Sequence, residues 1–411
     1  MPAEIIVQKY GGSSVADAER IRNVARRVAL AYEQRSPRVV VVVSAMGKTT
    51  DNLIALAHQI TAQPDPRELD LLLSTGEIVS IALLAMALRE QGHEAISLTG
   101  YQAGIRTEAR YGAARILDVD PERVVRELDR GRIVIVAGFQ GFTDEFDITT
   151  LGRGGSDTTA VALAAALGAK CCEIYTDVDG VFTADPRLVP AARQLRDISY
   201  EEMLELASQG AKVMHPRAVE LGELFDLPIL VASSFNERPG TVIRRSVVME
   251  KGNKVRGIAH DVNIGKVTII GVPDRPGIAA QVFGPLAEAG ISVDIIVQNT
   301  GQHGKTDLSY SVARADLARA ESITREVATV IGAEGVTSSG DLGKVSIVGS
   351  GMQSAPGYAA RMFEALYRAG INIEMITTSE IRITCVIKAE RVPDAVRALH
   401  AAFQLDQPDT P

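Results

Sequence analysis

Several short segments of this chain combine glycines with charged side chains, the composition of loops that bind phosphates. In the first segment, KYGGSS, Lys9 and Tyr10 precede two glycines. Glycine lets the backbone approach a ligand closely, a following helix N-terminus offers free N–H groups to an anion, and a lysine adds positive charge. The segment therefore suits a phosphate, although an ordinary strand-to-helix turn with a surface lysine would read the same way.

A second glycine-rich segment, TLGRGGSDTTA, precedes an alanine-rich stretch that has helical character. Ser156 or Asp157 could merely cap that helix. Capping requires neither Arg153 nor three glycines in four positions. Anion binding is therefore the stronger interpretation of this loop.

Three further segments each have a functional and a purely structural interpretation. In YTDVDGVFTADPR, Asp177, Asp179 and Asp185 could form turns in an Asp-Gly hairpin or help hold a nucleotide and its Mg²⁺. In GAKVMHP, Lys212 would ordinarily be a solvated surface residue. In STGE, Glu77 stands at the start of a long apolar helix, where a carboxylate complements the helix dipole.

Other nucleotide and metal signatures fail. In SAMGKTTD, Gly47, Lys48 and Thr49 match the end of a Walker A loop, but the position of its first glycine is occupied by Val42. The segment GRGGSD lacks the last glycine of a dinucleotide fingerprint. The histidines are scattered without metal-ligand spacing, so no protein-bound metal is expected. Cys171, Cys172 and Cys385 form no CxxC pair and are expected to be buried free thiols in a reducing cytosol.

These loops must be positioned by the elements around them. Apolar, β-branched runs predict strands at 3–9, 38–44, 95–98, 132–138, 171–176 and 227–233. Helical periodicity lies between them, including 17–32 with Asp17 as its N-cap, 50–62 and 68–91. Alternating strands and helices predict an α/β fold with a mainly parallel sheet flanked by helices.

An internal repeat marks the C-terminal third. Residues 266–299 align with 344–379, and each copy predicts a strand, a Pro-Gly turn, an amphipathic helix, an Ala-Gly pair and a strand. Two α+β units of the ferredoxin-like βαββαβ type explain this pattern. We expect a catalytic domain over 1–245, a linker over 246–265, and repeat domains over 266–340 and 341–411.

Composition narrows the possible partners. The net charge of −8 argues against broad nucleic-acid binding, while a small anion held by local cations fits. No basic and apolar leader is visible at the N-terminus, and the apolar stretch at 78–88 is too short to span a bilayer. We therefore expect a cytoplasmic protein without a membrane partner.

Taken in order, KYGGSS, SAMGKTTD, STGE, TLGRGGSDTTA, YTDVDGVFTADPR, GAKVMHP and the two repeats resemble the aspartokinases of the amino-acid kinase superfamily, which carry tandem regulatory ACT domains. The resemblance covers essentially the whole chain, and no motif position departs from it. It implies that MgATP phosphorylates the β-carboxylate of L-aspartate, with ATP and Mg²⁺ as cofactors. A carboxylate is ionised at neutral pH and needs no general base, so positioning and cations must supply most of the catalysis.

The resemblance also assigns roles to residues. The catalytic residues that it implies are Lys9, Asp157 and Lys212. Those implied to bind aspartate are Ser44, Thr49, Glu77, Arg153, Gly154, Gly155 and Ser156, with Arg153 on the α-carboxylate and Glu77 on the α-ammonium. Those implied to bind ATP are Lys9, Tyr10, Gly11, Gly12, Ser13, Thr176, Asp177, Val181, Phe182, Thr183, Ala184, Asp185, Pro186, Arg187 and Lys212.

The resemblance further implies feedback inhibition by lysine, threonine or both, at interfaces between ACT domains. The implied effector residues are Asp274, Gly277, Ile278, Ala279, Ser292, Asp294, Gln298, Tyr358, Ala359, Asn372, Ile373 and Ser379. The repeats could instead serve only for dimerisation. Related short aspartokinases form homodimers or α2β2 assemblies, and Met249 is a candidate internal start for a β chain.

Two competing hypotheses remain. Another amino-acid kinase, acting on glutamate, N-acetylglutamate, carbamate or UMP, would share the fold and the loops, but Glu77, Arg153 and the repeats favour a free amino acid as substrate. A non-catalytic amino-acid sensor would be expected to lack Lys9, Asp157 or Lys212, and all three are present.

Overall fold

A computed structural model describes residues 3–211, 213–245, 254–298, 304–352 and 356–407. These residues form two compact units. The N-terminal unit comprises 3–182, 194–208 and 213–245, and the C-terminal unit comprises 183–193, 209–211 and the described residues from 254 onward. Two segments of the N-terminal half therefore belong to the C-terminal unit.

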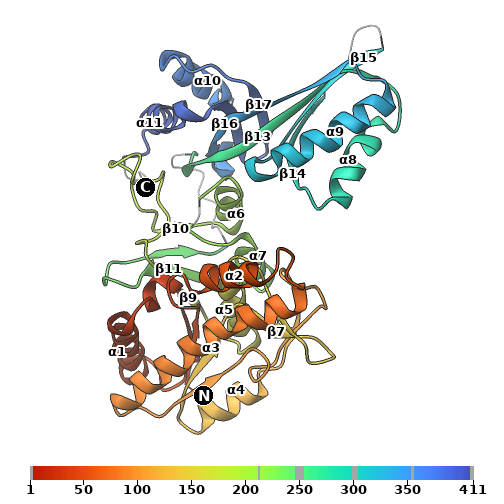
Figure 1. The fold of residues 1–411 in the computed structure, drawn as a ribbon. Helices are drawn as coiled ribbons and strands as arrows, with labels where there is room; N and C mark the ends of the chain where they lie inside the picture. The colour runs from red at the N-terminus through yellow and green to blue at the C-terminus, as the bar shows by residue number, and fades with distance from the viewer. Residues whose placement is uncertain (1–2, 212, 246–253, 299–303, 353–355, 408–411) are drawn as a thin grey trace. The chain divides into compact units, whose positions relative to one another are not determined.

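The N-terminal unit is built on an eight-stranded sheet with the order β10-β12-β11-β9-β1-β2-β6-β3, of which β9, β10 and β11 are labelled in Figure 1. Its strands are parallel except for the β11–β12 pair. The strands are β1 (Ile6–Tyr10), β2 (Val39–Val43), β3 (Ala95–Leu98), β6 (Ile133–Ala137), β9 (Cys172–Thr176), β10 (Asp197–Ile198), β11 (Ile229–Ser233) and β12 (Thr241–Ile243). The predicted mainly parallel sheet is confirmed, with a short antiparallel pair near one edge.

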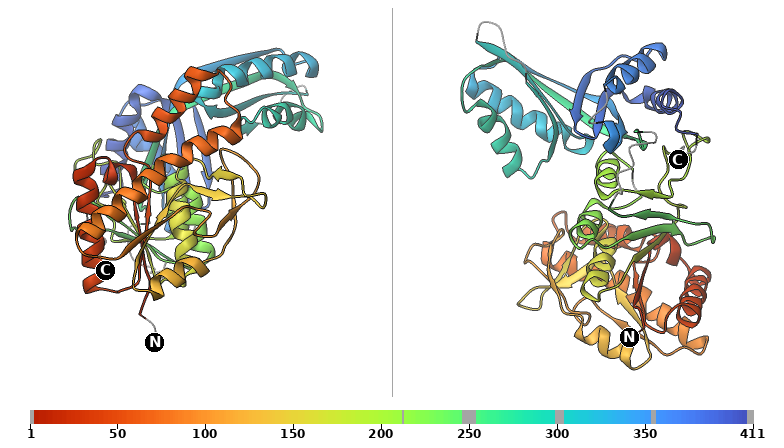
Figure 2. Two further views of the ribbon diagram at one scale, coloured as in Figure 1. Left: turned by 60° about the horizontal axis from the view of Figure 1, so that its bottom comes forward. Right: turned by 180° about the vertical axis from the view of Figure 1, so that it is seen from behind.

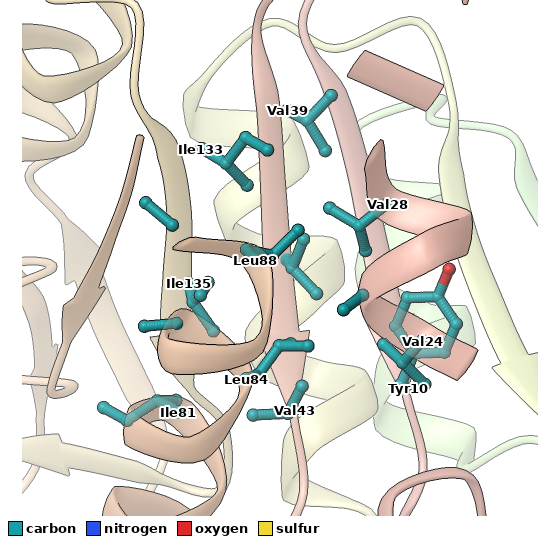
Figure 3. Close-up of a cluster of buried hydrophobic side chains, with 14 of the residues drawn as sticks. Tyr10, Val24, Val28, Val39, Val43, Ile81, Leu84, Leu88, Ile133 and Ile135 are labelled. Carbon is teal, nitrogen blue, oxygen red and sulfur yellow. The ribbon is translucent and has the colours of Figure 1, made fainter. Parts of the chain in front are cut away.

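Helices cover both faces of this sheet, as the continuous apolar strands require. All five valines of β2 are buried, because neighbouring side chains of a strand point to opposite faces and both faces are covered. Figure 3 shows one face, where Val28 and Leu84 pack over Val39 and Val43. The helices are α1 (Ala18–Gln34), α2 (Thr49–Ile60), α3 (Pro66–Glu90), α4 (Glu122–Asp129), α5 (Gly155–Ala166), α6 (Tyr200–Ser208) and α7 (Pro216–Leu224).

Two helices of this unit illustrate how the sequence sets their bounds. Asp17 caps α1 by accepting a hydrogen bond from the Arg20 amide at 2.9 Å, as predicted. By length and composition alone α3 could span a membrane, but half of its most apolar window is buried within the protein.

A four-stranded sheet with the order β5-β4-β7-β8 was not foreseen from the sequence. Its strands are β4 (Ile105–Thr107), β5 (Ile116–Val119), β7 (Gln140–Phe142) and β8 (Ile148–Thr150). Each has only three or four residues, too few for an alternating pattern to stand out from loop sequence.

The C-terminal unit holds both repeats on one six-stranded antiparallel sheet with the order β14-β15-β13-β16-β18-β17. The helices of each repeat lie side by side, α8 with α9 (cyan) and α10 with α11 (blue) in Figure 2. The elements are β13 (Gly257–Pro273), α8 (Ile278–Glu288), β14 (Val293–Gln298), β15 (Lys305–Ala313), α9 (Leu317–Ile331), β16 (Gly335–Val348), α10 (Tyr358–Arg368), β17 (Met375–Ser379), β18 (Arg382–Lys388) and α11 (Val392–Ala402).

The two repeats share their central strands. Residues 266–270 of β13 pair with 335–339 of β16 in the first repeat, while 257–261 pair with 344–348 in the second. The second repeat thus takes its fourth strand from residues that precede the first repeat. The sequence predicts a linker over 246–265, yet β13 begins at Gly257, and residues 246–253 lie outside the described part of the chain.

Candidate active site

The glycine-rich loops converge at the carboxyl ends of neighbouring parallel strands. The amide of Gly11 donates to the carbonyl of Tyr175 (3.2 Å), and the amide of Ser44 donates to the carbonyl of Tyr10 (3.1 Å). The amide of Gly138 donates in turn to Val43 at the end of β2 (3.0 Å). This edge is where open α/β sheets place their ligands.

Lys9 is a buried cation that reaches across to α5. Its Nζ lies 2.6 Å from Oδ1 of Asp157, and the two side chains are only 10% and 13% exposed. The alternative prediction of a surface lysine in an ordinary turn is therefore wrong. An ammonium group removed from most of its water is placed here only with a partner, and an ion pair beside free backbone amides can rearrange toward an anionic ligand.

Two glycines in these loops are required by close packing. A Cβ on Gly12 would lie 2.7 Å from the carbonyl oxygen of Ala45, so only glycine allows this loop to pack on the 44–47 turn. Gly154 has φ +72, and a Cβ there would lie 2.3 Å from the His215 ring. The backbones of both loops are thus held close to neighbouring segments.

Glu77 is a buried carboxylate with spare hydrogen-bonding capacity. It is 2% exposed, and its Oε1 accepts from the Ala45 amide at 3.0 Å. Its Oε2 is buried and has no hydrogen-bond partner among the residues that the structure describes. Burial raises the pKa of Glu77 to about 7.

The position of Glu77 also corrects one interpretation of the sequence. The helix α3 starts at Pro66, so Glu77 lies well inside it and does not serve the helix dipole at the N-terminus. The predicted aspartate-binding residues Ser44 and Thr49 are half-buried nearby: Ser44 follows β2 and Thr49 begins α2. A Cβ added to Gly76, next to Glu77, would lie 3.4 Å from Cγ2 of Thr49.

The start of α5 has a cation, Arg153, directly before it. Its N-cap is Gly154, and no side chain caps the helix, so capping by Ser156 or Asp157 is not observed. Arg153 is exposed and makes no ion pair or hydrogen bond within the described part of the chain. An unpaired guanidinium beside a helix N-terminus can take a carboxylate in a bidentate manner.

The aspartate-rich segment does not form an Asp-Gly hairpin. The strand β9 ends at Thr176, and Phe182 makes an isolated antiparallel bridge with Gln194. Asp179 is held by Arg238 (3.2 Å), and Asp185 by Arg187 (2.7 Å).

At the end of β9, Asp177 remains exposed and accepts from the Thr176 hydroxyl at 3.1 Å. Asp177 is thus the carboxylate of this segment that remains open to a ligand. Among the described residues, no group of three or more His, Cys, Asp or Glu side chains could hold a metal ion.

Two residues that the sequence analysis named lie outside the described structure, and two polar residues of the N-terminal unit were not named by it. Lys212 and Met249 lie outside the described residues. His215 covers Gly154, its Nδ1 is buried without a partner in the described structure, and burial lowers its pKa. Asp70 is buried and accepts from the amides of Gly112 and Thr150. Only the GAKVMHP motif, which contains His215, gave a signal for either.

The predicted effector residues divide between the two repeats. Gly277 and Gly357 occupy the same place in each, as left-handed N-caps of α8 and α10. Asp294 of β14 is already engaged, because its Oδ2 lies 2.7 Å from Nζ of the buried Lys344. A ligand ammonium at Asp294 would have to share or displace that lysine.

Comparison with known proteins agrees with this architecture. The amino acid kinase family model matches residues 4–233, and two ACT domain models match 266–332 and 345–403. An aspartokinase of Bacillus sp. (strain MGA3) is 52% identical over 401 residues, covering 98% of this chain and 97% of the relative.

Solved structures show the same likeness. Escherichia coli aspartokinase III in complex with aspartate and ADP (R-state) is 28% identical, with a TM-score of 0.80 over 97% of this chain and 99% of that one. Its complex with lysine and aspartate (T-state) gives a TM-score of 0.75 at 28% identity, covering 98% and 100%. The resemblance seen in the motifs is confirmed: the chain is a kinase that belongs to the aspartokinase family, with an amino acid kinase domain followed by ACT domains.

Proposed function

We propose that this protein transfers the γ-phosphoryl group of MgATP to the β-carboxylate of L-aspartate, giving 4-phospho-L-aspartate and ADP. A carboxylate oxygen forms the new P–O bond while the bond to the β,γ-bridging oxygen breaks. No proton must be removed, because the nucleophile is already an anion. The observation that carries the proposal is the pair of unsatisfied charges, Glu77 and Arg153, beside the Lys9–Asp157 ion pair.

The two unsatisfied groups match the α-groups of a free amino acid. Glu77 has a free carboxylate oxygen for an α-ammonium, and Arg153 has a free guanidinium for an α-carboxylate. Binding of a cation to Glu77 would also remove the cost of ionising a buried carboxyl group. Ser44, Thr49, Gly154, Gly155 and Ser156 complete the proposed aspartate site.

The phosphoryl group would be received by cations and backbone amides. Lys9 neutralises charge on the transferring group, Gly12 offers its backbone N–H, Gly11 leaves room for close approach, and Asp157 holds the lysine in place. Lys212 is proposed as a second cation on the same group. Charge neutralisation of this kind is most of what phosphoryl transfer to an anion needs.

The nucleotide would be bound by Tyr10, Ser13 and the segment that follows β9, from Thr176 and Asp177 through residues 181–187. Mg²⁺ would enter with the ATP phosphates, and the exposed Asp177 is a carboxylate that could contact it. That E. coli aspartokinase III binds aspartate and ADP supports this pair of ligands.

Regulation is the second part of the proposal. The ACT domains would bind lysine, threonine or both and inhibit the kinase, as the lysine complex of E. coli aspartokinase III supports. The assembly would be a homodimer or an α2β2 oligomer in the cytoplasm, with domain limits near residues 245, 265 and 340.

The test is formation of acyl phosphate, trapped with hydroxylamine as the hydroxamate. We expect ATP- and Mg²⁺-dependent product from L-aspartate, none from glutamate, N-acetylglutamate, carbamate or UMP, and inhibition when lysine and threonine are added. Product from another acceptor alone would identify a different amino-acid kinase. A folded protein that binds ATP but converts no acceptor would be the non-catalytic sensor.

A further inference from the structure

The proposed nucleotide-binding residues 181–187 cross the boundary between the two units. Val181 and Phe182 belong to the N-terminal unit, whereas residues 183–193 belong to the C-terminal unit. The segment 183–193, here called the shared loop, thus follows proposed ATP-binding residues of the N-terminal unit in the sequence and is packed within the C-terminal unit. The contacts that hold the shared loop in place therefore come from the C-terminal unit.

Thr183, the first residue of the shared loop, is 1% exposed and has all of its backbone hydrogen-bonding groups satisfied. Its amide donates to the Arg193 carbonyl (2.9 Å), and its carbonyl accepts from the Ile258 amide of β13 (2.8 Å). Its hydroxyl oxygen accepts from the Arg193 amide (3.0 Å) and lies 3.0 Å from Nε2 of His400.

His400 is the one side chain of α11 that forms a hydrogen bond with Thr183 within the described structure. It is 3% exposed, and burial lowers its pKa, so the neutral imidazole is the stable form. The hydroxyl hydrogen of Thr183 then finds its acceptor at Nε2, since the hydroxyl oxygen is already an acceptor for Arg193. A buried hydroxyl left without an acceptor would be unfavourable.

Apolar residues of the shared loop belong to the same hydrophobic core as α11. Ala184 and Val189 belong to the hydrophobic core that contains Val396, Leu399 and Phe403. This core forms around the second repeat, and the hydrogen-bonded residues Thr183 and His400 are 217 residues apart in the sequence.

We propose that His400 is a positioning residue for the nucleotide site: it holds Thr183 through one hydrogen bond, and thereby fixes the start of residues 183–187 for MgATP binding. The inference rests on the proposed function for the identity of the nucleotide. By this proposal, a residue of the second ACT repeat helps to set the affinity for MgATP. A structural change around His400 would then alter nucleotide binding directly.

The test compares three variants by steady-state kinetics and hydrogen exchange. His400→Leu removes the acceptor, His400→Gln supplies a carbonyl oxygen near the position of Nε2, and His400→Asn is polar but too short to reach. We expect Leu and Asn to raise KM for MgATP about fivefold, the size of one lost neutral hydrogen bond, and Gln to restore it. KM for aspartate and kcat at saturating MgATP stay within about twofold.

Val396→Ala is the matched control, because Val396 lies in the same helix and core and does not contact Thr183 through a hydrogen bond. It should lower stability without raising KM for MgATP. Equal effects of the Leu, Asn, Gln and Val396 variants would reduce His400 to a structural role and overturn the proposal, as would an unchanged KM in the Leu and Asn variants. If His400→Leu does not fold, the Asn and Gln pair decides.

Hydrogen exchange separates this inference from the proposed function. The Arg193 amide, which donates to Thr183, should exchange faster in the Leu and Asn variants than in Gln or Val396→Ala. A protein that makes no hydroxamate would refute the proposed function, yet this exchange pattern and MgADP affinity would still test the positioning by His400. Unchanged exchange at Arg193 would overturn it.

Discussion

Two buried glutamates of the N-terminal unit, Glu127 and Glu77, have pKa values that are shifted in opposite directions. Glu127, in α4, has no exposed surface and pairs with Arg123 (2.8 Å), Arg130 (3.1 Å) and Arg132 (2.8 Å). Burial alone would raise the pKa of Glu127, but the arginines outweigh it and the pKa is lowered. Glu77 is also buried, pairs with no cation among the residues that the structure describes, and has its pKa raised to about 7.

The difference distinguishes a structural charge from one that is kept for a ligand. The carboxylate of Glu127 pairs with three arginines near the end of α4, so its charge is already compensated within the protein. Glu77 has one backbone amide and one unused oxygen, an arrangement that costs stability in the free protein. Such a cost is expected at functional sites, where the partner arrives with the ligand.

The largest expected effect comes from Lys9, which pairs with Asp157 and is proposed to act on the phosphoryl group. Lys9→Met should lower kcat by about 100- to 1,000-fold, the range for loss of one preorganised charge donor. Steady-state kinetics on hydroxamate formation measures it. Lys170→Met, which removes an exposed lysine paired with Glu4, should change kcat by less than about twofold; a similar loss in both variants would contradict the role of Lys9.

The next effect tests the two glutamates directly. Glu77→Gln should raise KM for aspartate about 10- to 100-fold, because a hydrogen bond to a charged group is lost, and should not lower stability near pH 8. Glu127→Gln should leave KM unchanged and lower the free energy of unfolding by about 1–3 kcal/mol. Kinetics and denaturant unfolding of both variants measure this; the reverse pattern would show that the comparison is wrong.

The pH dependence should be smaller and specific to aspartate. In the proposed site the α-ammonium of aspartate pairs with ionised Glu77, so KM for aspartate should rise as pH falls below about 7, while KM for MgATP stays flat. For stability the sign is opposite: a carboxyl pKa raised by folding stabilises the protein at low pH, and this contribution is lost as pH rises from about 4.5 to 7. Relative to Glu77→Gln, the free protein should lose roughly 3 kcal/mol over that range.

Much of the fold could be predicted from local sequence, for physical reasons. Runs such as residues 39–43 are β-branched throughout, and Asp17 precedes a clear helical period, so strands and helices are visible without tertiary information. The internal repeat in the sequence predicted the two ACT domains of the C-terminal unit. The exchange of residues 257–261 into the second repeat could not be seen, because nothing local specifies which strand completes a sheet.

The site was predictable where glycine and charge occur together, and not where packing decides. The loops around Lys9 and Arg153 stand out by composition. Two contacts could not be predicted, because each joins segments that are distant in the sequence. They are the packing of His215 on Gly154 and the hydrogen bond between His400 and Thr183. The same limit applies to Glu77, because its burial and its unused carboxylate oxygen are properties of the folded unit.

The most direct test of the account compares L-aspartate with succinate, which lacks the α-ammonium group. The measured quantity is the ratio of kcat/KM for the two acceptors, in the unmodified protein and in Glu77→Gln. We expect the unmodified protein to prefer L-aspartate by about 100-fold or more, as a site built for a charged group rejects an analogue without it, and the variant to lose most of this preference. An unchanged ratio in the variant would show that Glu77 does not recognise the substrate ammonium.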